Sequence, residues 1–160
     1  MNARAYLSLG SNVEPEWHLR AAIDALRARF GKVVVSPVYR VPAVGFDGPD
    51  FLNAAAIIAT DLDPIALTEW LHALERDNGR VRNAAKFSDR TLDVDLVYFD
   101  DLIVDLPQLQ LPRPELRHAF VLRPLADIAP DFVDPVRGET LADLWRAHPE
   151  HNAPMHLVPL

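Results

Sequence analysis

Apolar residues alternate with polar ones or cluster in β-branched runs in four stretches, which predicts four strands. The first covers residues 4–10, and the second covers 32–41, where Pro37 favours an edge strand or a bulge. A third strand is expected over 51–62, and a fourth over 90–99, with the sequence "RTLDVDLVYF".

Apolar residues spaced by three or four predict two amphipathic helices between these strands. The first helix covers 14–30, with Gly31 as its C-terminal cap. The second begins after Asp63, a plausible N-cap, and is closed by Gly79. Further expectations are loops over 42–50 and 109–118, short helices over 121–129 and 140–147, and a loosely ordered tail over 148–160.

The order strand, helix, strand, strand, helix, strand is the βαββαβ pattern of a ferredoxin-like α+β domain. We therefore predict a sandwich with a mainly antiparallel sheet and extra C-terminal elements. No repeat or linker divides residues 1–160, so we expect a single domain.

Composition narrows the function classes. The chain has 160 residues, no cysteine and a formal net charge of −7 at pH 7. The acidic balance argues against a nucleic-acid surface, and the absence of cysteine excludes disulfides and thiolate metal sites. The start of the chain has too short an apolar run for a signal peptide, and no stretch reaches the length of a membrane span. We expect a cytoplasmic protein with no membrane partner.

Two aspartates lie inside the fourth predicted strand. Asp93 and Asp95 are two positions apart, so their side chains point to the same face, where two carboxylates can hold Mg²⁺. The same spacing also occurs on solvated strand faces and at helix caps. Asp61 and Asp63 have it too, and we interpret those two as a strand end and a helix cap.

A basic cluster precedes the aspartates. Arg80, Arg82, Lys86 and Arg90 lie within eleven residues of an otherwise acidic chain, shortly after Glu75. By itself this cluster is typical of a solvated loop. Together with the aspartates it favours a site for polyphosphate transfer, because arginines bind phosphate oxygens. No "GxxxxGK[ST]" motif is present, so a P-loop is excluded.

A second set of residues suits a flat, polar-edged ring. Phe51 and Asn53 share a strand face, where an aromatic ring can stack on a substrate and an amide can bind its edge. The alternative, that Phe51 belongs to the core and Asn53 caps the strand, is equally compatible with the spacing. Phe120 is open to both interpretations.

Six segments together resemble a known family. They are "YLSLGSN", "SPVYRVPAVG", "PDFLNAA", "LERDNGRVR", "RTLDVDLVYFDD" and "AFVLRPLADIAP". They are similar to 6-hydroxymethyl-7,8-dihydropterin pyrophosphokinases of the folate pathway, from about residue 5 to about residue 145. The resemblance implies transfer of the β,γ-diphosphate of ATP to the pterin hydroxymethyl group, with small-molecule substrates and two Mg²⁺ ions. We also expect a monomer.

The resemblance also implies roles for individual residues. The metal ligands would be Asp93 and Asp95, with Arg80 and Arg90 as catalytic loop arginines. The pterin would be bound by Gly10, Pro42, Val44, Phe51, Asn53 and Phe120. The nucleotide would be bound by Glu75, Arg82, Arg90, Arg113 and Arg117.

The stretch "LPRPELRHAF" departs from the family pattern. Arg113 stands where the family has a histidine, His118 stands where it has an arginine, and the stretch is one residue shorter. Arg113 or Arg117 can supply replacement donors to a phosphate. Phe87 also stands where a tryptophan is common. An alternative is therefore a pterin-binding paralogue with altered or lost ATP use. A third hypothesis, a ferredoxin-like RNA-binding module, lacks a basic-aromatic strand and conflicts with the acidic charge.

Overall fold

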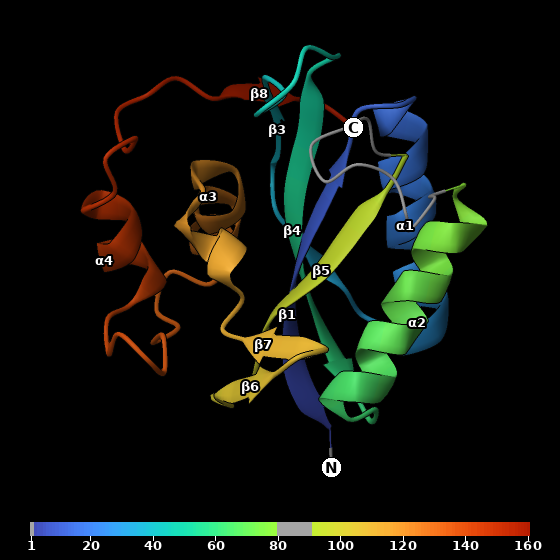
Figure 1. Cartoon of the computed structure of the whole chain (residues 1–160), viewed down its shortest axis with the longest axis vertical. Helices are drawn as coiled ribbons and strands as arrows, with labels where there is room; N and C mark the ends of the chain where they lie inside the picture. Colours follow the sequence, from blue (N-terminus) through green and yellow to red (C-terminus); the bar gives the residue numbers. More distant parts are fainter. Residues whose placement is uncertain (1, 80–90) are drawn as a thin grey trace.

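A computed structural model describes residues 2–79 and 91–160 of the chain. One antiparallel sheet lies between two layers of helices (Figure 1). The helices are α1 (Pro15–Phe30), α2 (Pro64–Asp77), α3 (Ala119–Ile128) and α4 (Leu141–Arg146), with a 3₁₀ turn η1 (Pro114–Arg117). The strands are β1 (Ala3–Ser11), β2 (Val34–Val35), β3 (Val38–Val41), β4 (Phe51–Thr60), β5 (Asp93–Phe99), β6 (Val104–Leu106), β7 (Leu109–Leu111) and β8 (His156–Val158).

The main sheet has the strand order β5-β1-β4-β3-β8, and β2 also pairs with β4. Every pairing is antiparallel. Strands β6 and β7 form a separate hairpin. The predicted α+β fold with a mainly antiparallel sheet is confirmed, and the order of its first four strands is that of a ferredoxin-like sandwich.

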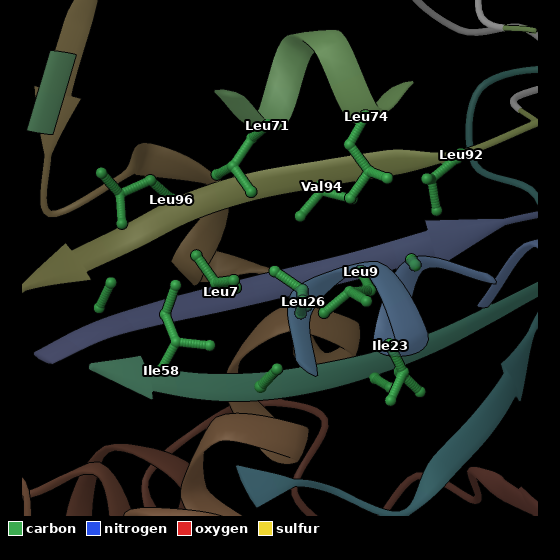
Figure 2. Packing of buried hydrophobic residues seen from close by; sticks show 14 of the residues in the cluster. Leu7, Leu9, Ile23, Leu26, Ile58, Leu71, Leu74, Leu92, Val94 and Leu96 are labelled. Carbon is green, nitrogen blue, oxygen red and sulfur yellow. The ribbon is translucent and has the colours of Figure 1, made fainter. Parts of the chain in front are cut away.

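The larger core lies between the sheet and the helices α1 and α2. Leu71 and Leu74 of α2 point toward Val94 on β5, while α1 covers the neighbouring strands (Figure 2). Alternation along β5 places Val94 in this core, so Asp93 and Asp95 point to the other face of the sheet. That second face is covered by α3.

A smaller core lies under α3 and contains three aromatic rings in mutual contact. Tyr6 and Tyr98 each lie within 6.0 Å, centroid to centroid, of one another and of Phe132. The Tyr98 hydroxyl donates a 2.5 Å hydrogen bond to Asp134, a fully buried residue that also accepts from the backbone N–H of Arg137. This network ties the chain after α3 to β5.

Two of the predicted helix ends are confirmed. Gly31 ends α1 at a φ of 83°, and the Asp63 carboxylate accepts a 2.8 Å hydrogen bond from the Ala66 N–H at the start of α2. Asp61 instead forms a 3.3 Å ion pair with Arg29. Asp61 and Asp63 are therefore structural, as the sequence suggested.

Three segments differ from the predictions. The expected strand over 32–41 is divided into β2 and β3 around Pro37, which has no N–H to continue the ladder. The expected loop over 109–118 contains β7 and η1, and the tail over 148–160 contains β8, which pairs with β3. Among the described residues, no helix is both long and apolar enough to cross a membrane.

Candidate active site

Three neighbouring strands place functional side chains in one row. Gly10 on β1 pairs with Asp93 on β5 and with Asn53 on β4. Two strand spacings, about 10 Å, therefore separate the backbones of Asp93 and Asn53. Asp95 lies opposite Ser8, one step along the same face. These residues line a cavity of about 330 Å³ on the α3 side of the sheet.

Gly10 allows the Asn53 side chain to lie flat against β1. A Cβ atom at Gly10 would come within 2.9 Å of Asn53 Nδ2, closer than side-chain contacts normally allow. Asn53 is only 5% exposed, and its Oδ1 atom has no hydrogen-bond partner among the residues that the structure describes. A buried amide oxygen without a partner costs free energy, so this atom is suited to accept a hydrogen bond from a ligand.

Aromatic and apolar side chains form the walls around Asn53. Phe51 is half-buried at the start of β4 and meets Phe46 edge-on, with their centroids 6.3 Å apart. Phe120, in the first turn of α3, also lines the cavity; it is half-buried and lies parallel to His118, with a centroid distance of 4.8 Å and an interplanar angle of 11°. Pro42 and Val44 from the exposed loop after β3 complete this end.

The Asp95 end of the cavity holds two arginines. The backbone N–H of Arg113 donates to the Val97 carbonyl at 3.1 Å, which fixes Arg113 to β5. Its Nη2 lies 3.4 Å from Asp95 Oδ1, and its Nε lies 2.8 Å from Glu115 Oε2. The second contact is an ion pair without hydrogen-bond alignment. Arg117 is more exposed and donates to the Pro114 carbonyl at 3.4 Å.

The surroundings of His118 favour the neutral form of its imidazole. Burial lowers the pKa of its imidazole, and the nearby Arg117 guanidinium lowers it further. A neutral ring can stack on Phe120 without adding positive charge to the pocket.

Asp93 and Asp95 are two carboxylates of the cavity that could donate oxygen atoms to a cation. Within residues 2–79 and 91–160, no group of three or more histidine, aspartate or glutamate side chains could hold a metal ion. Asp93 and Asp95 nevertheless fit Mg²⁺, which usually takes one or two carboxylates and completes its shell with water and substrate phosphates.

The structure brings together most of the predicted site residues that it describes. The cavity is lined by Gly10, Pro42, Val44, Phe51, Asn53, Asp93, Asp95, Arg113, Arg117 and Phe120. Glu75 does not line it: this residue is 1% exposed in α2 and accepts a 2.9 Å hydrogen bond from the Val94 N–H. Arg80, Arg82 and Arg90 lie outside the described residues.

Other lining residues were missed by the sequence reasoning. Ser8 could have been found, because it alternates with Gly10 along β1 and so shares its face. Phe46 and Glu115 carry no comparable pattern, since one lies in an irregular loop and the other in a single 3₁₀ turn. Val41 and Val121 also line the cavity.

Comparisons with known proteins show the family of the chain. The family model for 7,8-dihydro-6-hydroxymethylpterin-pyrophosphokinase (HPPK) matches residues 6–130. A 2-amino-4-hydroxy-6-hydroxymethyldihydropteridine pyrophosphokinase of Pseudomonas aeruginosa is 41% identical over 154 residues, which cover 93% of this chain and 94% of the relative. The folic acid synthesis protein fol1 of Schizosaccharomyces pombe is 33% identical over 147 residues, covering 89% of this chain and 20% of that protein.

A solved structure supports the fold. Wild-type HPPK-DHPS of Plasmodium falciparum aligns with a TM-score of 0.71 at 14% sequence identity, over 91% of this chain. This chain spans 44% of the length of that one. The family match extends from β1 to beyond α3, and the Pseudomonas relative is similar over nearly its whole length. The chain therefore belongs to the 7,8-dihydro-6-hydroxymethylpterin-pyrophosphokinase family.

Proposed function

We propose that the chain transfers the β,γ-diphosphate of ATP to the hydroxymethyl group of 6-hydroxymethyl-7,8-dihydropterin in folate biosynthesis, releasing AMP. One observation carries this proposal. The buried amide of Asn53 and the carboxylate of Asp93 flank Gly10 in a single row of the sheet, inside one cavity. A ring bound at Asn53 would direct a substituent toward the aspartates.

The pterin end of the cavity selects a flat ring with polar edges. Phe51 and Phe120 would stack on the two faces of the ring, and Asn53 Oδ1 would accept from an edge N–H. Fixing the ring in this way also positions its hydroxymethyl oxygen, which lowers the entropic part of the barrier.

The aspartate end suits a polyphosphate. Asp93 and Asp95 would hold Mg²⁺, with two ions expected, and Arg113 and Arg117 would donate to phosphate oxygens. When bound, Mg²⁺ would neutralise phosphate charge. The hydroxymethyl oxygen would bond to the β-phosphorus as the bond from that phosphorus to the oxygen of the α-phosphate breaks, and the hydroxyl proton would be released. Arg80, Arg82 and Arg90 precede β5 in the sequence and are proposed to assist this transfer.

Product analysis tests the proposal. Purified protein is mixed with ATP, Mg²⁺ and 6-hydroxymethyl-7,8-dihydropterin, and the nucleotides and pterins are resolved by chromatography. AMP and a diphosphorylated pterin in equal amounts are expected, with neither product when Mg²⁺ is omitted. ADP in place of AMP would contradict diphosphate transfer.

The departures at Arg113 and His118 favour one alternative, a pterin-binding paralogue that has lost ATP use. Pterin binding by calorimetry without any AMP formation would support this alternative over the enzyme.

We further propose that residues 1–160 act as one cytoplasmic, monomeric domain with no nucleic-acid partner. Pairing of β8 with β3 supports inclusion of the C-terminal tail in that domain. Light scattering in solution should give the mass of one chain, 17.9 kDa.

A further inference from the structure

Arg113 lies between two carboxylates at the phosphate end of the cavity. Its guanidinium is 3.4 Å from Asp95 on β5 and 2.8 Å from Glu115 in η1. The three side chains are each between 31% and 38% exposed. The guanidinium therefore occupies space beside Asp95 that a cation bound to this carboxylate would also need.

The Arg113 side chain can move while the Arg113 backbone stays in place. The Arg113 N–H is hydrogen-bonded to the Val97 carbonyl, so the backbone is fixed two residues beyond Asp95 on the same strand. Only the side chain must rotate for the guanidinium to leave Asp95. An ion pair as exposed as that of Arg113 with Asp95 strengthens its own formation by only roughly twofold to fivefold. A divalent cation can therefore displace Arg113 from Asp95.

Arg117 provides a contrast within the same cavity. It lines the same cavity and carries the same charge, but its guanidinium donates a hydrogen bond to the Pro114 carbonyl. Among the described residues, no carboxylate lies within ion-pair distance of Arg117. The cavity therefore contains one arginine paired with a predicted metal ligand and one that is not.

We propose that Arg113 is an exchangeable counter-ion of Asp95. It neutralises this carboxylate until a divalent cation takes its place and then moves to a nucleotide phosphate, while Glu115 positions it between the two states. This inference rests on the proposed function. Metal and nucleotide then bind with positive coupling, because the nucleotide draws Arg113 away from the carboxylate that the metal needs.

Mn²⁺ binding to the nucleotide-free protein tests the exchange, with free Mn²⁺ measured by electron paramagnetic resonance. Arg113→Met removes the competing charge and keeps most of the side-chain volume, so it should lower the Mn²⁺ dissociation constant about threefold to fivefold. Arg117→Met is the matched control and should change this constant less than twofold. Equal effects of the two substitutions would show that the loss of any positive charge in the cavity changes Mn²⁺ affinity. That result would overturn exchange at Asp95.

The role of Glu115 is tested by a double-mutant cycle. Glu115→Gln releases Arg113 toward Asp95 and should weaken Mn²⁺ binding by about twofold or more in the parent background, but by less in the Arg113→Met background. Equal effects in both backgrounds would remove Glu115 from the proposal, since the lost negative charge alone would explain them.

Nucleotide binding tests whether Arg113 contacts a nucleotide phosphate. With Mg²⁺ present, Arg113→Met should weaken binding of a non-hydrolysable ATP analogue about tenfold, because a charge-assisted contact is lost. Unchanged Mn²⁺ and nucleotide affinities in this variant, in a parent that still forms AMP, would overturn the exchange and leave the proposed function intact. A parent that forms no AMP would contradict the proposed function instead.

Discussion

Replacing Gly10 by alanine tests whether Asn53 recognises the substrate. The new Cβ would lie 2.9 Å from Asn53 Nδ2, about 0.6 Å short of a favourable ~3.5 Å contact. The nearest atom is the end of a side chain, and the next atoms are at 3.8 Å or more. The amide must therefore turn away, while the pairing of β1 with β4 can remain.

The fold should tolerate this change. Alanine in a strand is favoured over glycine by roughly 0.5–1 kcal/mol, and moving one side chain off its preferred rotamer costs about 0.5–1.5 kcal/mol. These opposing effects leave the free energy of unfolding within about 1 kcal/mol of the parent, a shift of at most about 4 °C in Tm for a chain of this size.

Gly10→Ala should weaken pterin binding. Loss of the Asn53 hydrogen bonds, with buried polar groups left unpaired, costs about 2–3 kcal/mol, or roughly 30- to 150-fold in Kd. Calorimetric titration with the pterin substrate measures this loss. Asn53→Ala should show a similar loss, and adding Gly10→Ala to it should have little further effect, because the two substitutions act through one side chain. A folded Gly10→Ala variant that binds pterin as tightly as the parent would refute the reasoning.

Substitutions at three other positions give further predictions. Asp95→Ala should abolish AMP formation. Its free energy of unfolding, measured in urea, should stay within about 1 kcal/mol of the parent, because relief of carboxylate repulsion offsets the loss of a weak, exposed pair with Arg113. A strongly destabilised variant would assign Asp95 a structural role. Glu75→Leu should destabilise the protein by about 1–3 kcal/mol in urea by leaving the Val94 N–H unpaired, whereas Glu75→Gln keeps an acceptor and should cost less; equal losses would contradict this. The pKa of His118 is lowered in the folded protein, so the unfolded state binds the proton first and the parent should lose stability as the pH falls below about 6.5. Thermal melts across this range should show a smaller loss for His118→Phe, and an unchanged pH dependence would exclude His118 as the cause.

Local patterns in the sequence predict much of the fold and of the site. Alternation places Asp93 and Asp95 opposite the larger core, and it places Phe51 and Asn53 on one face of β4, with Leu52 buried on the other. Those positions follow from the geometry of a single strand. The roles assigned to them remain predictions.

Contacts between distant segments are not visible in these patterns. The register shifts between Tyr6 and Leu7, so that Val97 and Tyr98 are both buried under α3 although they are consecutive. All the residues around this irregularity are apolar, so alternation gives no indication of it. The same limit applies to the contact of Arg113 with Asp95, because it depends on how η1 is placed against β5.

A crystal structure with the pterin substrate, Mg²⁺ and a non-hydrolysable ATP analogue would test the central claim most directly. The account predicts the pterin ring between Phe51 and Phe120 with its edge at Asn53, and the phosphates beside Asp93 and Asp95. A second hollow of about 490 Å³ lies between α2 and the β6–β7 hairpin and is lined by Ile65, Val104, Leu106 and Leu109. Finding either substrate there, with the row from Asn53 to Asp93 empty, would contradict the account.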